Sequence, residues 1–168
     1  DELGLEFFLS PKKYIFEQDV GKGGFSNSIK DLIPNTSPIG SFIVHIGKNK
    51  EKLLYAREVD LNGDDRAFGQ ALGIPECCVK AFNMNSTEAS VNQNDFTLFA
   101  LSKDFFESDP WSINCAQYFG YGLVSHFPCS VNCKKTSEMA KASARLLRDV
   151  APSLALDFIK FQGYCYIY

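Results

Sequence analysis

Apolar residues in this chain follow a strand-like pattern around residue 45 and a helical one after residue 64. Ser41 to Gly47, SFIVHIG, is apolar and β-branched and predicts a buried strand, whereas Leu53 to Val59 fits either a strand or a helix. The stretch from Gly21 to Gly40 is dense in Gly, Ser, Asn and Pro and predicts a loop. We therefore expect little β-structure, all of it early in the chain.

From Asp64 onward the pattern predicts helices with clear ends. Apolar residues recur at helical spacing from Asp64 up to Gly73, which suits a helix stop. Pro75 then suits the first turn of a new helix, ECCVKAFNM. Cys77 and Cys78 are therefore expected near a helix N-terminus.

Three more helices are expected towards the C-terminus. Phe96 to Phe106 predicts a mostly buried helix, and Pro152 opens a last one before an aromatic tail that suits an edge strand or coil. Between them a long helix follows Ser130, its expected N-cap. The apolar face of this long helix is expected to comprise Met139, Ala142, Leu146 and Val150.

These elements predict an α+β fold, mostly helical with a small β-sheet, in one domain over residues 1–168. A chain of this length that is 45% hydrophobic can bury one core and is short for two. It lacks an apolar run near the roughly 20 residues that span a bilayer, and its first residues lack the order of a secretory signal. We expect a cytoplasmic protein without membrane contact. The chain begins at Asp1 without Met, so the sequence leaves open whether residues precede it.

Charge and cysteine content narrow the classes of function. A net charge of -3 and a pI near 5.4 argue against a nucleic-acid binder. Six cysteines would suit a disulfide framework in a secreted domain, but a chain with its own core has little need of one. We favour reduced thiols, and leave Cys115 and Cys165, which sit among aromatic residues, outside any site.

The other four cysteines form two pairs that each follow a proline at an expected helix N-terminus. Cys77 and Cys78 lie in segment 73–82, and Cys129 and Cys133 lie in segment 126–136. Helix N-termini favour thiolates, and four thiolates suit zinc or an iron-sulfur cluster. Adjacent cysteines and an x-x-x spacing are unusual for structural zinc, so the spacing favours a cluster, 4Fe–4S before 2Fe–2S. The alternative without a metal makes the first pair core residues and the second a surface pair.

Two kinds of polar residue near these cysteines are candidates for chemistry. His126, three residues before Cys129, suits a ligand, a proton donor, the base of a metal-free cysteine nucleophile, or a loop histidine with a structural hydrogen bond. His45 is expected to be structural. Lys134 is a catalytic candidate because lysine in a first helical turn opposes the helix dipole unless an anion lies nearby. The remaining cations, which suit substrate contacts or a solvated face, are Lys80, Lys135, Lys141, Arg145, Arg148 and Arg66.

Two motifs, LGIPECCVKAF and HFPCSVNCKKT, carry a resemblance to a known family. They resemble the paired Gly-x-Pro-x-Cys-Cys and Phe-Pro-Cys-Ser-x-x-Cys motifs of an uncharacterised, mainly archaeal family. The resemblance covers about the middle third of the chain and implies no reaction. It supports treating the four cysteines as one set. The matched residues are Gly73, Pro75, Cys77, Cys78, Pro128, Cys129, Ser130 and Cys133.

The sequence thus predicts a cysteine-ligated metalloprotein. Our first hypothesis is an iron-sulfur oxidoreductase or sulfur-handling enzyme. Its expected substrate is small or peptide-borne, with an anion as one candidate, and its expected partner is an electron donor. The second is a zinc-stapled structural or interaction module without catalysis. The third is a metal-free enzyme with a cysteine nucleophile.

Overall fold

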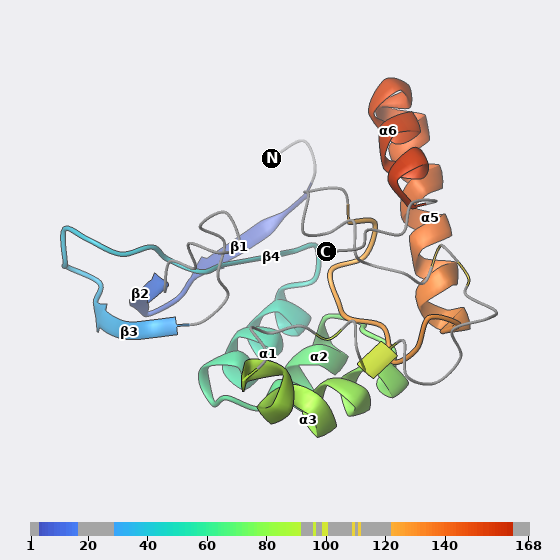
Figure 1. Ribbon diagram of the computed structural model, residues 1–168. Helices are drawn as coiled ribbons and strands as arrows, with labels where there is room; N and C mark the ends of the chain where they lie inside the picture. Colours follow the sequence, from blue (N-terminus) through green and yellow to red (C-terminus); the bar gives the residue numbers. More distant parts are fainter. Residues whose placement is uncertain are drawn as a thin grey trace. The chain divides into compact units, whose positions relative to one another are not determined.

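The computed structural model describes residues 4–16, 29–91, 96, 99–100, 109, 111 and 122–162. These residues form four short strands and five helices, in two compact units that comprise Asp1–Ala71 and Leu72–Tyr168 (Figure 1). The predicted fold class, α+β and mostly helical with a small β element, is confirmed. The expected single domain stays a prediction, since the described residues divide into these two units.

The first unit holds two small antiparallel sheets. β1 (Glu6–Leu9) pairs with β4 (Val44–Gly47), and β2 (Lys12–Phe16) pairs with β3 (Ile29–Pro34). The strand expected at 41–47 is confirmed over its last four residues. The loop expected at 21–40 is wrong over β3: Pro34 occupies the last pair of the ladder, where a missing N–H is tolerated, so a strand fits beside these turn residues.

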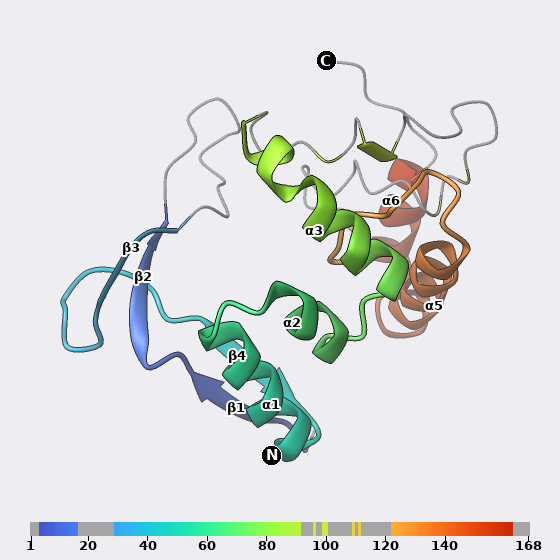
Figure 2. The same ribbon diagram turned by 90° about the horizontal axis from the view of Figure 1, so that it is seen from below.

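Helices α1 (Lys50–Leu61) and α2 (Asp65–Ala71) complete the first unit, and α1 packs on β1 and β4 (Figure 2). The Asn49 side chain accepts a hydrogen bond from the Lys52 N–H at 2.9 Å and caps α1. This cap, with buried residues at helical spacing, makes Leu53 to Val59 a helix rather than a strand. The expected stop after α2 is confirmed at Gly73, whose φ of 76° suits glycine.

His45 has the structural position that its strand predicts. It is 7% exposed on β4, its Nε2 lies 2.9 Å from Asp60 Oδ2 on α1, and its ring edge faces Phe68. Asp60→Ala is expected to lower the free energy of unfolding by about 1–3 kcal/mol, because it leaves this buried imidazole nitrogen without its acceptor. Urea unfolding checks this, with Glu58→Ala, an exposed change on the same helix, as the control. Equal effects of both variants would contradict the assigned role.

The second unit is built from α3 (Glu76–Val91), α5 (Lys134–Val150) and α6 (Pro152–Gln162). The helix starts predicted after Pro75 and at Pro152 are confirmed. The predicted N-cap Ser130 is wrong, because the N-cap of α5 is Cys133. Ser130 instead opens a tight turn in which its carbonyl accepts the Cys133 N–H at 3.2 Å.

The buried face of α5 differs from the predicted one. Its buried residues are Thr136, Ser137, Ala140 and Ala144, whereas Leu146 and Val150 are 66% and 71% exposed. Ala140 and Ala144 pack with Leu123 in a small core, which partly buried residues of α5 and α6 extend. Small side chains let helices approach closely, so the small residues face the core although larger apolar ones were available.

Several predictions lie outside the described residues. They concern the aromatic tail, Cys115 and Cys165, and most of the helix expected at Phe96 to Phe106. Among the described helices, none has the length and apolar character needed to cross a membrane.

Candidate metal centre

Cys77 and Cys78 lie in the first turn of α3. The Pro75 carbonyl accepts the backbone N–H of Cys78 at 2.8 Å and that of Val79 at 3.0 Å, which starts the helix. Successive residues of a helix point about 100° apart, so the two cysteines differ in surroundings. Cys77 is exposed, whereas Cys78 is only 1% exposed. The expected placement of both thiols at a helix N-terminus is confirmed.

Cys129 and Cys133 bracket a turn that leads into α5. Cys133 is the N-cap, and its carbonyl accepts the Ser137 N–H at 3.0 Å. The turn itself is anchored, because the Val131 N–H donates to the Ala100 carbonyl at 3.3 Å and Asn132 Oδ1 accepts the Asp109 N–H at 3.0 Å. The three residues between the cysteines thus form a turn that lets both sulfurs face the same point.

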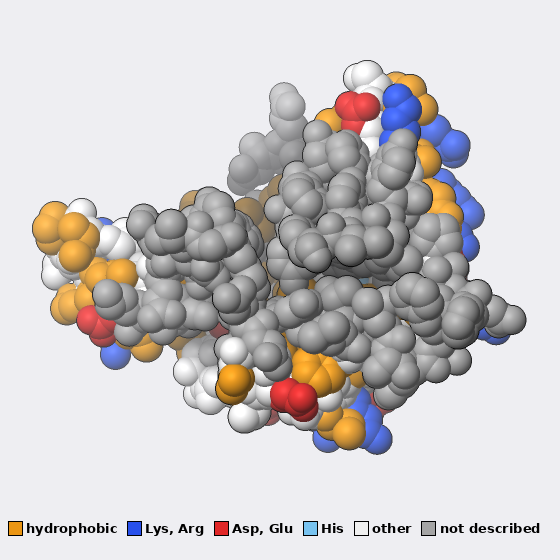
Figure 3. All heavy atoms as spheres, viewed as in Figure 1, with side chains coloured by type: hydrophobic (Ala, Val, Ile, Leu, Met, Phe, Trp, Pro, Cys, Tyr) orange, Lys and Arg blue, Asp and Glu red, His pale blue; other side chains and the backbone are white. Residues whose placement is uncertain are grey.

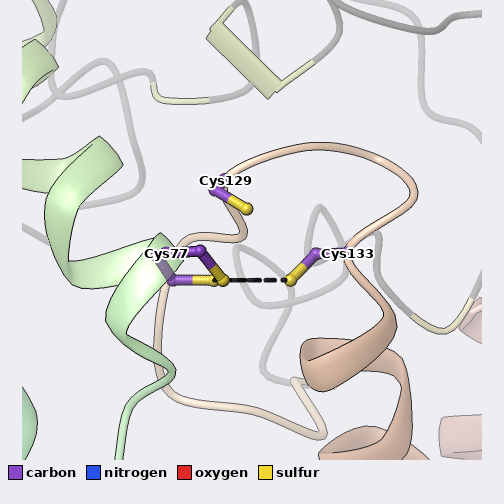
Figure 4. Close-up of side chains that lie close together, drawn as sticks. Cys77, Cys129 and Cys133 are labelled. Atoms are coloured by element: carbon purple, nitrogen blue, oxygen red, sulfur yellow. Dashed lines mark hydrogen bonds between the residues drawn. The ribbon is translucent and has the colours of Figure 1, made fainter.

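The four sulfurs converge, as Figure 4 shows for Cys77, Cys129 and Cys133. Cys77 Sγ lies 3.9 Å from Cys78 Sγ and 3.8 Å from Cys133 Sγ, and Cys78 Sγ lies 3.6 Å from Cys133 Sγ. All four sulfurs, including that of Cys129, lie within 4.8 Å of one another. The predicted convergence of two distant cysteine pairs into a group that can hold a metal is therefore confirmed.

The thiols differ in how readily they ionise. Burial raises the pKa of Cys78, against hydrogen bonds from Thr136 and the Cys129 backbone, and burial and the neighbouring Cys133 raise the pKa of Cys129 to about 11. Burial also opposes ionisation of Cys133, but the Thr136 side chain and backbone N–H, with smaller effects of Cys78 and Cys129, lower its pKa to about 7. Without a metal, the thiolate charge at neutral pH therefore lies mainly on Cys133 rather than on Cys78 or Cys129.

Thr136 connects the cysteines to His126. Its hydroxyl, fully buried, lies 3.4 Å from Cys78 Sγ and 2.9 Å from His126 Nε2. A hydroxyl has one proton, so Thr136 donates to one ionised sulfur at a time, Cys78 or Cys133, while it accepts from His126 Nε2–H. His126 is 5% exposed, and burial lowers its pKa, which favours the neutral imidazole; the tautomer with its proton on Nε2 makes this bond. His126 thus lies behind the sulfurs, and the four-cysteine group does not include it.

Thr136 is the site residue that the sequence analysis missed. With Ser130 as the expected N-cap, Thr136 falls deep in a helix, where its side chain has no special role. With Cys133 as the N-cap, Thr136 is the N3 residue, whose N–H and side chain face the cap. A threonine three residues after a cysteine at a helix start is the pattern that would have identified it.

The cations predicted near the site lie mainly along α5. Lys and Arg side chains gather along the edge where Figure 1 draws α5 and α6 (Figure 3). Lys134 and Lys135 are exposed in the first turn, directly after Cys133, and Lys141 Nζ lies 3.6 Å from Asp109 Oδ2. Lys80 is exposed on α3, as are Arg145 and Arg148 on α5, whereas Arg66 belongs to the first unit. A site of four thiolates with one divalent ion carries net negative charge, which suits the lysines of this first turn.

An aromatic stack lies beside Cys129. The Phe96 ring stacks on Phe82 at 4.9 Å and on Phe127 at 4.5 Å between ring centroids. A small hollow beside the stack is lined by these rings, by Pro128 and by Cys129. This packing gives Cys129 apolar surroundings on one side.

The fold and the site define the class: a mostly helical α+β protein in which two helix N-termini and a turn bring four cysteines together. No protein-family model, curated protein or solved structure matches the chain. The interpretation of the site therefore rests on the geometry of its own residues.

Proposed function

We propose that the protein is a zinc protein in which Cys77, Cys78, Cys129 and Cys133 bind one tetrahedral ion. The observation that carries the proposal is the spacing of the sulfurs. Four sulfurs at about 2.3 Å from one zinc ion lie about 3.8 Å apart. The three closest pairs lie 3.6, 3.8 and 3.9 Å apart, which supports a single ion.

An iron-sulfur cluster places its cysteine sulfurs farther apart. The four ligands of a 4Fe–4S cluster bind four different irons, so their sulfurs lie about 6 Å from one another. A 2Fe–2S cluster separates two pairs of sulfurs in a similar way. Sulfurs that all lie within 4.8 Å of one another favour zinc over either cluster. The iron-sulfur enzyme of the sequence analysis stays a prediction that the same experiment tests.

Zinc bound there supplies a cross-link between parts of the chain that are far apart in sequence. Cys77 and Cys78 belong to α3, while Cys129 and Cys133 belong to the turn before α5. Among the described residues, the core beside α5 comprises Leu123, Ala140 and Ala144 with larger partly buried residues packed against them. A structural metal adds folding free energy to that of such a core. We therefore propose a zinc-stapled module as the function that the geometry supports best.

The catalytic roles of His126 and Lys134 that the sequence suggests remain proposals. His126 is buried and hydrogen-bonded to Thr136. This position suits a residue that orients Thr136 better than one that transfers a proton to a substrate. Lys134 is exposed beside Cys133 and suits contact with an anion. A substrate, an electron donor, a cytoplasmic location and membership of the resembled archaeal family also stand as proposals.

Anaerobic purification with metal analysis and a visible absorption spectrum tests the proposal. We expect one zinc per chain and no visible band, with the zinc lost in Cys78→Ala and Cys129→Ala. Cys115→Ala, which removes a cysteine outside the proposed site, is the control and is expected to retain the metal. Iron with sulfide and a broad visible band would instead support the iron-sulfur prediction. A chain that neither contains nor takes up metal would overturn both.

Zinc uptake is expected to release at least two protons at pH 7. The raised pKa values of Cys78 and Cys129 keep both thiols protonated in the metal-free protein, and zinc displaces those protons. Each displaced proton raises the affinity about tenfold per pH unit, so these two give about 100-fold between pH 7 and 8. Below a pH of about 7 Cys133 also holds its proton, and the dependence steepens. Calorimetric titration in two buffers with different ionisation heats counts the protons; an affinity independent of pH would contradict this.

A further inference from the structure

The four cysteine residues are unequally exposed to solvent. Cys78 and Cys133 are 1% and 6% exposed, and the hydroxyl of Thr136 lies against Cys78. Cys129 is partly covered and lines the hollow beside the Phe96 stack. Cys77 is the exposed member of the set. A small reagent in solution therefore reaches Cys77 before the other three.

We propose that Cys77 is a site of reversible oxidation by hydroperoxides and that its disulfide partner is Cys133. This inference rests on the proposed function, because the oxidation releases the zinc ion of that site. The Sγ atoms of these two residues lie 3.8 Å apart (Figure 4). Thiolates are the species that hydroperoxides oxidise, and susceptibility follows thiolate character and exposure. A zinc-bound Cys77 combines both properties.

The geometry selects Cys133 among the three neighbouring cysteines. Cys78 Sγ is equally near, at 3.9 Å, but Cys77 and Cys78 are adjacent in α3, and adjacent side chains of a helix do not face each other. A disulfide needs Cβ atoms about 3.8 Å apart, which a helical pair cannot reach without unwinding. Cys133 is an N-cap residue with extended backbone, φ −65° and ψ 100°, and can approach Cys77 without breaking a helix. Cys129 also interacts with Cys77 and lies within 4.8 Å of it, but it borders the hollow beside the Phe96 stack, so Cys133 at 3.8 Å is the partner that we assign, and the fragmentation data distinguish the two.

The reaction proceeds in two balanced steps. The Cys77 thiolate attacks the terminal oxygen of the hydroperoxide, the O–O bond breaks, and the alkoxide or hydroxide leaves with the electron pair and takes a proton from water. Cys77 is then a sulfenic acid. The Cys133 thiolate attacks its sulfur, the S–O bond breaks, and hydroxide leaves and is protonated to water. Two thiolates are oxidised by two electrons, the hydroperoxide is reduced to an alcohol or water, and the zinc site loses two of its four ligands.

Treatment of the zinc-loaded full chain with one equivalent of hydrogen peroxide tests the proposal. A chromogenic chelator measures the released zinc, and mass spectrometry with peptide fragmentation identifies the linked cysteines. We expect about one zinc released per peroxide consumed, a Cys77–Cys133 link, and recovery of zinc binding after dithiothreitol. In the zinc-loaded wild type, the sulfenic-acid reagent dimedone is expected to label Cys77 at least tenfold more than any of the other three ligands. Cys115→Ser, which replaces a cysteine that is not one of the four proposed ligands, is expected to release zinc at the wild-type rate.

The outcomes separate this proposal from the proposed function. A chain that binds no zinc overturns both. A chain that binds zinc but keeps it under peroxide overturns only the oxidation proposal. The same holds if the link joins another pair, or if dimedone labels another ligand before Cys77.

Discussion

Replacement of Cys78 by alanine is expected to abolish tight zinc binding and to lower the free energy of unfolding by several kcal/mol. Structural zinc contributes about 10–16 kcal/mol of apparent binding free energy in small zinc domains, and that free energy stabilises the fold. Cys78 is the most buried of the four cysteines, and its sulfur is within 4.0 Å of both Cys77 and Cys133. Urea unfolding of the zinc-loaded proteins measures the difference.

The cavity that the alanine leaves must be separated from the loss of the metal. In excess chelator the wild type and Cys78→Ala are expected to unfold within about 1 kcal/mol of each other, because the metal is then absent from both and only a buried sulfur differs. A Cys78→Ala variant that still binds one zinc per chain with wild-type stability would show that Cys78 is not a ligand.

Replacement of Thr136 by valine is expected to weaken zinc binding by about 10–100-fold, the usual effect of losing a residue that supports a metal ligand. Valine keeps the shape of threonine but removes the hydroxyl that contacts Cys78 Sγ and His126 Nε2. Competition with a chelator of known affinity measures the change.

Thr136→Ser is the matched control, because serine keeps the hydroxyl and removes one methyl group. It is expected to retain an affinity within about threefold of the wild type, given only the small packing loss of one methyl. If valine and serine reduce the affinity equally, packing rather than the hydrogen bond explains the role of Thr136, and the assigned link to His126 falls.

The convergence of the cysteines could be predicted because its causes are local. Pro75 and Pro128 each precede a cysteine pair closely, and a helix start follows each. These local signals correctly place Cys77, Cys78 and Cys133 at helix N-termini, where thiolates are favoured, whereas Cys129 lies in the turn before α5. The convergence of the two pairs could be predicted from their chemistry, because four thiolates together form a site for a soft metal ion.

The metal preferred by the sequence analysis depended on spacing along the chain, which is a weaker guide than spacing between sulfurs. Adjacent cysteines and an x-x-x gap are unusual for zinc ribbons. Here the helix at Cys77 and the turn before Cys133 bring the sulfurs of such a pattern to tetrahedral distances. The distances between the sulfurs could not be predicted from the local sequence, because the turn is held by hydrogen bonds to Ala100 and Asp109, which are distant along the chain.

Details that depend on tertiary packing were not predictable. The N-cap of α5 is Cys133 rather than Ser130 because the turn, and not the helix, uses Ser130. The buried face of α5 is set by close packing of small residues, which a search for large apolar residues overlooks. Thr136 was missed for the same reason, since its role depends on where α5 begins.

X-ray absorption spectroscopy at the edge of the bound metal tests the central claim most directly. A single zinc ion held by the four cysteines predicts about four sulfur neighbours at about 2.3 Å and no second metal atom nearby. Iron in place of zinc, with a neighbouring iron shell from a cluster, would contradict the account and restore the iron-sulfur prediction.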